Sequence, residues 1–192
     1  MKELLLHICC GPCSVHPATL LSQDYQVIGY FYNPNIWPYE EWLRRYGAFE
    51  KFCKESGAIT DYFPKKPLTE EEFKREYQEF LNKVKGLEGE PEGGKRCSVC
   101  FKLRLKKAAQ FARENKIIIF ASTLTIGRNK RPEIINPIGV SSAMEYDIDF
   151  FEANWKKQDG ARKGCEISKK HELYRQHYCG CEFSNTDKNR HR

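Results

Sequence analysis

The chain has 192 residues, a formal net charge of +6 and nine cysteines. This length can bury the core of one domain without disulfides, no segment is apolar over the length that spans a bilayer, and His7 interrupts the short apolar stretch that a signal peptide would need. The sequence therefore predicts a cytoplasmic protein with no membrane segment, one α/β domain at 1–183 and a polar C-terminal tail at 184–192. The small positive surplus is compatible with an anionic partner such as nucleic acid, but does not by itself indicate one.

Strands and helices are expected to alternate along the chain. Runs rich in Val, Ile, Leu and aromatic residues predict strands, and apolar residues at helical spacing predict helices, one of them capped by Thr69 before three glutamates. The elements expected in the first half are a strand at 3–8, a turn at 9–14, a helix at 15–22, a strand at 25–32, a helix at 39–56, a strand at 59–63 and a helix from Thr69 to near Gly86.

The second half begins with a charged, glycine-rich loop and becomes less regular toward its end. Its expected elements are a loop at 87–96, a helix at 97–115, a strand at 116–121 and, with weaker periodicity, a helix at 141–146, a strand at 148–151 and a helix at 168–174. The alternation predicts a Rossmann-like parallel sheet flanked by helices, similar to the adenine nucleotide alpha hydrolase fold. Ligands of such folds gather at the carboxyl edge of the sheet, where the turn at 9–14 lies, so a metal site is expected at this edge.

Three cysteines leave this first turn. Cys9 and Cys10 are adjacent and poorly placed to form a disulfide with each other, because the small ring strains the peptide between them; a metal suits them better. Cys10-Gly-Pro-Cys13 has the spacing of the thioredoxin dithiol, but that interpretation leaves the later cysteine motifs unused. A radical-SAM pattern is excluded because its third cysteine position is occupied by His16. Whether Cys13 faces the metal or the helix stays open.

A second pair, Cys97-x-x-Cys100, opens a predicted helix. Its sulfurs lie one turn apart on one face, near the positive end of the helix, and both features favour the thiolate that binds metal. Four soft thiolates, two from each motif, suit a structural zinc ion and an iron-sulfur cluster equally well, so the residues alone leave both open. The four candidate ligands are Cys9, Cys10, Cys97 and Cys100.

The remaining cysteines form one C-terminal pair and two isolated thiols. Cys179-Gly-Cys181 could close a strained, easily reduced disulfide or bind a second metal. Cys53, on a predicted amphipathic helix, and Cys165, in a charged segment, are interpreted as structural or incidental thiols.

Other polar residues could contact a nucleic acid. Aromatic and amide side chains at the end of the second strand could stack on bases or simply close the strand; these are Tyr30, Tyr32, Asn33 and Asn35. Basic residues flanking the second cysteine pair could bind phosphates or form a solvated helix face; these are Arg96, Lys102, Arg104, Lys106 and Lys107. His7 and His16 are expected to be structural.

Together these motifs resemble one known family, the cobalamin-independent epoxyqueuosine reductases of the QueH type. The resemblance rests on HICCGPCS at 7–14, YFYNPNI at 30–36, RCSVCFKLRL at 96–105, STLTIGRNK at 122–130 and YRQHYCGCEFS at 174–184. These segments run nearly from end to end, and the order Cys-Cys, Cys-x-x-Cys, Tyr-Cys-Gly-Cys is specific. Gly11 stands where the family often has alanine, and Cys165 has no family counterpart.

The resemblance implies an oxidoreductase that acts on tRNA, with a catalytic domain at 1–183. It would reduce epoxyqueuosine in the wobble position of tRNA with a GUN anticodon to queuosine, the last step of queuosine biosynthesis, with a 4Fe-4S cluster and room for a second adjacent iron. An external donor such as ferredoxin or flavodoxin is expected by analogy. Carried over by position, the cluster ligands are Cys9, Cys10, Cys97 and Cys100, and the redox-active or second-metal pair is Cys179 and Cys181.

The reaction takes two electrons and two protons, whereas a 4Fe-4S cluster passes electrons singly. We expect the C-terminal cysteine pair to supply the second electron as a dithiol, or to hold a metal that polarises the epoxide oxygen. Two other hypotheses are a tRNA-binding module with a structural four-cysteine zinc site and a sulfur-transferring enzyme of the ATP-pyrophosphatase kind, which would need a Ser/Gly-rich phosphate loop in place of CCGPCS. Candidate general acids are Asp147, Asp149, Tyr174, His177 and Tyr178.

Overall fold

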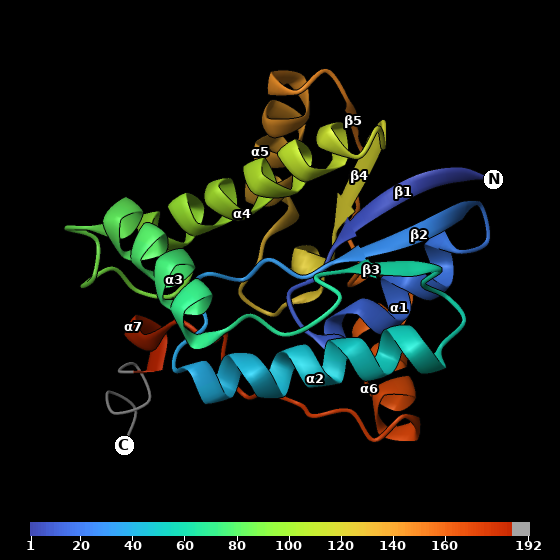
Figure 1. Cartoon of the computed structure of the whole chain (residues 1–192), viewed down its shortest axis with the longest axis horizontal. Helices are drawn as coiled ribbons and strands as arrows, with labels where there is room; N and C mark the ends of the chain where they lie inside the picture. Colours follow the sequence, from blue (N-terminus) through green and yellow to red (C-terminus); the bar gives the residue numbers. More distant parts are fainter. Residues whose placement is uncertain (186–192) are drawn as a thin grey trace.

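A computed structural model describes residues 1–185, which form a five-stranded sheet between two layers of helices (Figure 1). All neighbouring strands are parallel, and their order across the sheet is β3-β2-β1-β4-β5. The chain thus reverses its direction of travel beside β1, which is the switch point where ligands of such sheets bind. The predicted Rossmann-like fold is confirmed. The strands are β1 (Lys2–His7), β2 (Tyr25–Tyr30), β3 (Asp61–Phe63), β4 (Ile119–Ser122) and β5 (Asp149–Phe150).

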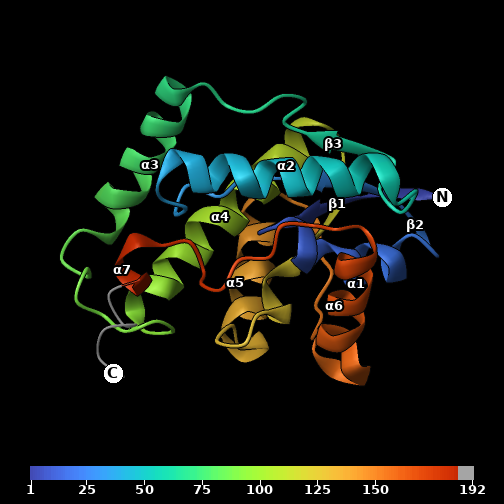
Figure 2. The same cartoon turned by 90° about the horizontal axis from the view of Figure 1, so that it is seen from below.

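Helices cover both faces of the sheet and its carboxyl edge. The helices are α1 (Gly11–Leu21), α2 (Tyr39–Glu55), α3 (Glu70–Val84), α4 (Lys95–Glu114), α5 (Pro132–Glu145), α6 (Gly160–Lys170) and α7 (Glu182–Asn185), with short 3-10 turns at Thr123–Ile126 and Lys157–Asp159. Figures 1 and 2 show α4 and α5 on one face and α1 and α2 on the other, with α6 against α1. None of the helices within residues 1–185 is long and apolar enough to cross a membrane.

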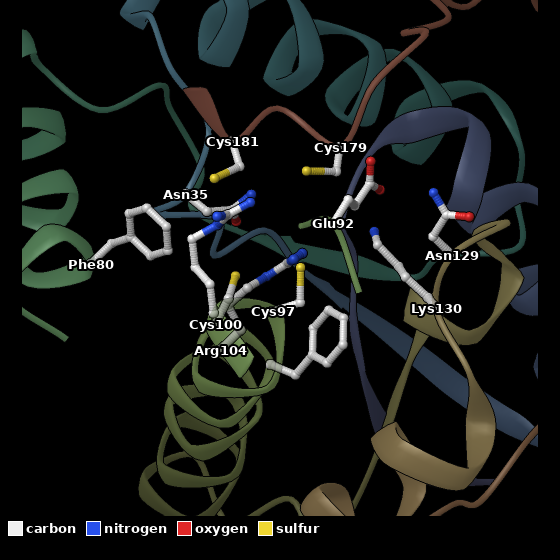
Figure 3. Close-up of a pocket in the computed structure, with 12 residues that line it drawn as sticks. Asn35, Phe80, Glu92, Cys97, Cys100, Arg104, Asn129, Lys130, Cys179 and Cys181 are labelled. Atoms are coloured by element: carbon white, nitrogen blue, oxygen red, sulfur yellow. The ribbon is translucent and has the colours of Figure 1, made fainter. Parts of the chain in front are cut away.

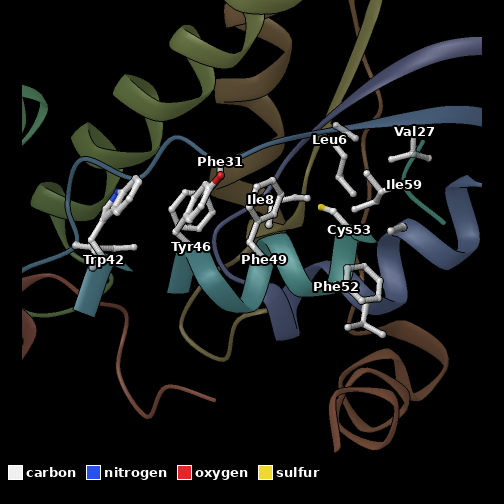
Figure 4. Close-up of a cluster of buried hydrophobic side chains, with 14 of the residues drawn as sticks. Leu6, Ile8, Val27, Phe31, Trp42, Tyr46, Phe49, Phe52, Cys53 and Ile59 are labelled. Atoms are coloured by element: carbon white, nitrogen blue, oxygen red, sulfur yellow. The ribbon is translucent and has the colours of Figure 1, made fainter. Parts of the chain in front are cut away.

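Two apolar layers fix this arrangement. Alternate residues of β1 point to opposite faces, so Leu4 and Leu6 pack toward α1 and α2, whereas Leu5 packs toward α4 and α5. Figure 4 shows the first layer, in which aromatic side chains of α2 such as Phe49 and Phe52 meet the sheet. The capping box predicted at Thr69 is present at the start of α3.

The first cysteine turn is shorter than predicted, because α1 begins at Gly11 instead of residue 15. Pro12 lies in the first turn of α1, where a missing N–H costs nothing, and Pro17 lies inside the helix. A Cβ at Gly11 would lie 2.6 Å from the carbonyl oxygen of Ala48 on α2, so here glycine allows α1 and α2 to touch. Cys13 is consequently helical, with its direction set by α1.

The C-terminal third differs most from the prediction. α5 spans 132–145 instead of 141–146, since Pro132, Pro137 and Gly139 obscure its apolar periodicity. α6 spans 160–170 instead of 168–174, because its sequence is rich in glycine and charge. The predicted polar tail begins within α7, where Ser184 is buried, and residues 186–192 lie outside the described part of the chain.

Candidate metal and redox site

The first group of cysteines is built by the turn between β1 and α1. Cys10 is the N-cap of α1, and Cys13 lies in its first turn. The sulfurs of Cys9, Cys10 and Cys13, which we call the turn group, all lie within 4.8 Å of one another. Cys13, which the sequence left undecided, thus joins the predicted pair. Three sulfurs at this separation can hold a metal centre.

The pKa values of the three thiols in the turn group are shifted in different directions. Hydrogen bonds from the thiols of Cys10 and Cys13 hold the pKa of Cys9 well below its usual range, and the cations Lys130 and Arg104 act in the same direction. Burial raises the pKa of Cys10 to about 12, and the hydrogen bond with Cys10 is the main cause that raises the pKa of Cys13. The group therefore favours one thiolate, on Cys9, and thiolates are the form that binds metal.

Buried polar residues anchor this turn to the neighbouring strands. Nδ1 of His7 lies 2.8 Å from the hydroxyl of Ser122, and Nε2 donates to the carbonyl of Tyr32 at 3.2 Å. Burial lowers the pKa of His7 to about 3, so the ring is neutral and structural, as the sequence predicted. The hydroxyl of Thr123 accepts from the backbone N–H of Cys9 at 3.1 Å and donates to its sulfur at 3.4 Å.

Four more cysteines line a pocket at the carboxyl edge (Figure 3). Cys97 and Cys100 lie at the start of α4, whereas Cys179 and Cys181 lie on the segment that precedes α7. Figure 3 shows the amine of Lys130 directed into the space between them. We call these four cysteines the pocket group. Charged side chains also line the pocket: Glu92, Arg96, Arg104 and Lys130.

The four cysteines predicted as ligands are divided between the two groups. Two belong to the turn group, and two belong to the pocket group together with the C-terminal pair. Burial raises the pKa of Cys100 to about 11, and Arg104 and Lys130 act against that increase. The same two cations lower the pKa of Cys9, so they stand near both groups. Seven of the nine cysteines thus gather at the predicted edge.

The C-terminal pair is a free dithiol. A hydrogen bond from the thiol of Cys181 is the main reason that the pKa of Cys179 lies well below its usual range, and the same bond raises the pKa of Cys181. The hydroxyl of Ser184 lies 3.1 Å from the sulfur of Cys179 and also favours the thiolate. The pair therefore favours the thiolate on Cys179 over that on Cys181, which suits an electron-donating dithiol and a metal ligand alike.

Arg45 on α2 holds the backbone of this pair. Its guanidinium donates to the carbonyls of Cys179 at 2.9 Å and Tyr178 at 3.2 Å, and to the carboxylate of Glu41 at 2.7 Å. The tight approach requires glycine between the cysteines: Gly180 has a φ of +99°, and a Cβ there would lie 2.7 Å from Nη1 of Arg45. A buried ion pair from one helix thus positions the C-terminal thiols.

Two buried arginines of the pocket have N–H groups without hydrogen-bond partners, and these groups show whether a metal-thiolate centre fits there. Arg96 and Arg104 are 1% and 2% exposed, yet Nε and Nη2 of Arg96 and Nε of Arg104 lack a hydrogen-bond partner within the described residues. Leaving such donors buried and unsatisfied is costly. An anionic centre whose sulfurs accept hydrogen bonds would satisfy them and balance their charge. The donor set therefore fits a thiolate-bound metal cluster.

Sequence reasoning missed three residues of this site. Lys130 lies within the STLTIGRNK motif, but nothing in its spacing indicated that it points at thiols. Arg45 looks like one of many charges on an amphipathic helix, and only the structure shows it to be buried. Gln176 donates to the sulfur of Cys10 at 2.6 Å, and its carbonyl oxygen is buried without a partner in the described part of the chain.

The structure decides between alternatives that the sequence left open for several residues. Tyr30 stacks on Phe111 with ring centroids 4.3 Å apart, and both Tyr30 and Tyr32 belong to the core, so neither is available to stack on a base. Asp149 opens β5 and Asp147 precedes it, which places both at the amino edge of the sheet, away from the pocket. They are therefore excluded as general acids for a substrate held at the cysteines.

The structure also shows which of the other candidate residues lie at the pocket and which lie elsewhere. Of the basic residues near the second cysteine pair, Arg96 and Arg104 face the pocket, whereas the lysines of α4 are exposed. Cys53 is buried in the core under α2, as expected for a structural thiol. Cys165 on α6 lines a separate hollow next to Cys13 and is not part of either group.

A Rossmann-like sheet with seven thiols at its switch point, three of them close enough to hold a metal centre, defines a protein with a candidate metal and redox site. The comparisons agree: residues 4–187 match the family of epoxyqueuosine reductase QueH. The chain is 40% identical over 192 residues to the epoxyqueuosine reductase QueH of Acinetobacter baylyi, covering 99% of this chain and 84% of that protein. The proteins of the same name from Haemophilus influenzae and Thermotoga maritima are 38% and 32% identical, over 100% and 96% of this chain and 75% and 91% of theirs.

The chain therefore belongs to the epoxyqueuosine reductase QueH family. This confirms the family resemblance that the cysteine motifs carried.

Proposed function

We propose that this chain reduces epoxyqueuosine in the wobble position of tRNA to queuosine, the last step of queuosine biosynthesis. Family membership over almost the whole chain supports the reaction. The observation that carries the chemistry is the gathering of seven thiols and the unpaired guanidinium donors of Arg96 and Arg104 at one edge of the sheet. Residues 1–183 would act as one catalytic domain.

The cofactor in this proposal is a 4Fe-4S cluster. Its proposed ligands are Cys9 and Cys10 from the turn group and Cys97 and Cys100 from the pocket group. When bound, such a cluster supplies electrons one at a time. The shared cationic neighbours support a ligand set drawn from both groups, because thiolates around one anionic centre need compensating positive charge.

The C-terminal pair would face the substrate. Opening the epoxide to an alkene consumes two electrons and two protons and releases the oxygen as water. Oxidation of the Cys179 thiolate and the Cys181 thiol to a disulfide releases two electrons and one proton, and the second proton comes from solvent, which balances the reaction; alternatively, the pair holds a second iron. Lys130, half-buried at the pocket, is placed to donate a hydrogen bond to the departing oxygen. Arg45 keeps the pair in place.

The proposed partners follow from the reaction. The substrate would be tRNA with a GUN anticodon, and a reduced one-electron carrier such as ferredoxin or flavodoxin would restore the site after each turnover. The proposed compartment is the cytoplasm, where a reducing environment keeps thiols free for metal.

The test is anaerobic purification, quantitation of iron and sulfide, and incubation with epoxyqueuosine-containing tRNA read by nucleoside mass spectrometry. About four irons and sulfides per chain together with queuosine formation are expected. Zinc without iron, and unaltered tRNA, would contradict both the cofactor and the reaction. Iron-loaded protein that leaves the tRNA unaltered with chemical and protein reductants would contradict the reaction alone.

A further inference from the structure

We propose that the loop at 127–131 is a preformed lip that binds the phosphate backbone of the tRNA beside the reacting nucleotide. This inference rests on the proposed function and specifies the surface that receives the substrate. The basic lip comprises Arg128, Asn129, Lys130 and Arg131. Its distinguishing feature is that two exposed arginines, Arg128 and Arg131, flank a pair of pocket-lining residues on a backbone held by Lys156.

The lip borders the cysteine pocket directly. It follows β4 and its 3-10 turn at the carboxyl edge of the sheet and leads into α5. Asn129 and Lys130 line the pocket, and Figure 3 shows the amine of Lys130 directed toward the cysteines. A polynucleotide that places one base at the cysteines must therefore pass its neighbouring phosphates over or beside this loop.

Three contacts fix the backbone of the lip. The N–H of Lys130 donates to the carbonyl of Gly127 at 3.1 Å and closes a turn. The ammonium of Lys156 donates to the carbonyls of Gly127 at 3.3 Å and Lys130 at 2.9 Å. A Cβ at Gly127 would lie 2.9 Å from Cδ of Lys130, so glycine leaves room for the stem of that lysine. The loop is ordered before any ligand arrives, which lowers the entropic cost of binding.

The two arginines of the lip are exposed and available to an anion. Neither Arg128 nor Arg131 forms an ion pair with a carboxylate within the described residues, whereas other exposed cations such as Lys106 and Arg162 do. Arg131 is also the N-cap of α5, a 14-residue helix whose positive end adds to the field. Exposed guanidinium groups in a fixed loop are typical phosphate ligands.

A loop that carries three glutamates meets the lip at the pocket. The loop before α4 carries Glu88, Glu90 and Glu92, and a Cβ on its Gly93 would lie 3.8 Å from the backbone oxygen of Asn129, so the two loops meet at the pocket. A polyanion is attracted to the arginines of the basic lip and repelled by the glutamates of the neighbouring loop. This asymmetry would fix the side from which the tRNA backbone approaches.

The test compares the doubly substituted R128A/R131A protein with the unaltered iron-loaded protein. Its affinity for in vitro transcribed substrate tRNA, measured by fluorescence anisotropy between about 50 and 200 mM salt, should fall about tenfold, and the salt slope should become shallower by about 1.5, as expected for two lost phosphate contacts. KM for tRNA should rise while kcat at saturating tRNA and iron content stay unchanged. The R128K/R131K protein should retain most of the affinity.

The matched control is K169A/K170A, which removes the same charge from the exposed end of α6, next to the His171–Glu55 contact at the far end of α2. It should bind tRNA almost normally. Equal losses in both variants, or an unchanged salt slope in R128A/R131A, would overturn the lip. Binding is measured without turnover, so a lip that binds tRNA would still be detected if the proposed reduction failed.

Discussion

The two cysteine groups are built in different ways. The turn group comes from five consecutive residues at the end of β1, and its backbone is fixed by the sheet and by α1. The pocket group joins two segments that are about eighty residues apart in the chain, and its C-terminal half has no sheet to support it. Instead, buried side chains hold that half, foremost Arg45 with Glu41. Main-chain geometry orders one group, and polar side chains order the other.

This difference suggests a division of labour. A group fixed by the sheet suits a permanent ligand set, because its geometry does not depend on the substrate. The C-terminal pair of the pocket group, held by a few polar contacts, can respond to substrate or change oxidation state without disturbing the core. The charges agree with this division: each group favours one thiolate, on Cys9 in one and on Cys179 in the other.

The largest expected effect is a loss of activity in C9S and C179S, and the iron content of the two variants distinguishes the cluster ligand from the redox-active thiol. C9S should lose most of its bound iron, whereas C179S should retain iron and its visible spectrum. Both variants should reduce epoxyqueuosine-containing tRNA at least about 100-fold more slowly, because turnover requires the cluster ligand and the C-terminal dithiol together. Iron quantitation and initial rates check this, with C53S as the control, since that thiol lies in the core away from the site. Equal iron loss in C9S and C179S would contradict this assignment and show that Cys179 is itself a cluster ligand.

The second prediction concerns the ion pair behind the C-terminal thiols. R45Q removes the buried cation that balances the carboxylate of Glu41 and leaves it with the hydroxyl of Tyr174 and the more distant Arg44; breaking a buried ion pair costs about 3 to 5 kcal/mol. The free energy of unfolding from denaturant titration should fall by that amount, and activity should fall with it. R44Q is the control: Arg44 also approaches Glu41, at 4.0 Å, but its side chain is 64% exposed, so the change should be below about 1 kcal/mol. Similar losses in both variants would argue against a special role for Arg45.

The third prediction tests how tightly the turn group is packed. G11A places a methyl group 2.6 Å from the carbonyl oxygen of Ala48, so α1 and α2 must separate, and the free energy of unfolding should fall by about 1 to 3 kcal/mol. G47A is the control on α2, where a Cβ meets nothing within 4 Å and alanine should stabilise the helix by about 0.5 to 1 kcal/mol. Thermal and denaturant unfolding check both signs. A neutral G11A protein would mean that the two helices separate without cost.

Features of the molecule that depend on local sequence could be predicted, and those that depend on contacts between distant segments could not. The sheet, most of its helices and the place of the first cysteines were predictable, because periodicity and the strand-turn-helix order are local features. The direction of Cys13 was not, since it depends on whether α1 begins at residue 11 or 15. The buried state of Arg45 and the inward direction of Lys130 depend on contacts between distant segments. In α5 and α6, proline, glycine and charge hide the helical period that the structure contains.

The smallest expected effect concerns the charge of the C-terminal pair. The thiol of Cys181 lowers the pKa of Cys179 by donating a hydrogen bond, so the thiolate fraction of Cys179 at neutral pH is larger than that of a thiol of ordinary pKa. In C181A the pKa of Cys179 should rise, and metal-free protein should react with iodoacetamide about tenfold more slowly at pH 7, because only the thiolate reacts.

Toward about pH 9.5, above the ordinary cysteine pKa, the thiolate fraction of Cys179 grows in both proteins, so the difference between the two rates should narrow. Peptide mass spectrometry measures the rates, and the ratio between the two pH values corrects for any change in access caused by the smaller side chain. A C181A protein slowed equally at both pH values would show that Cys181 controls access to Cys179 and not its charge. The pair would then owe its thiolate to Ser184 and Lys130, which remain beside Cys179 in that variant.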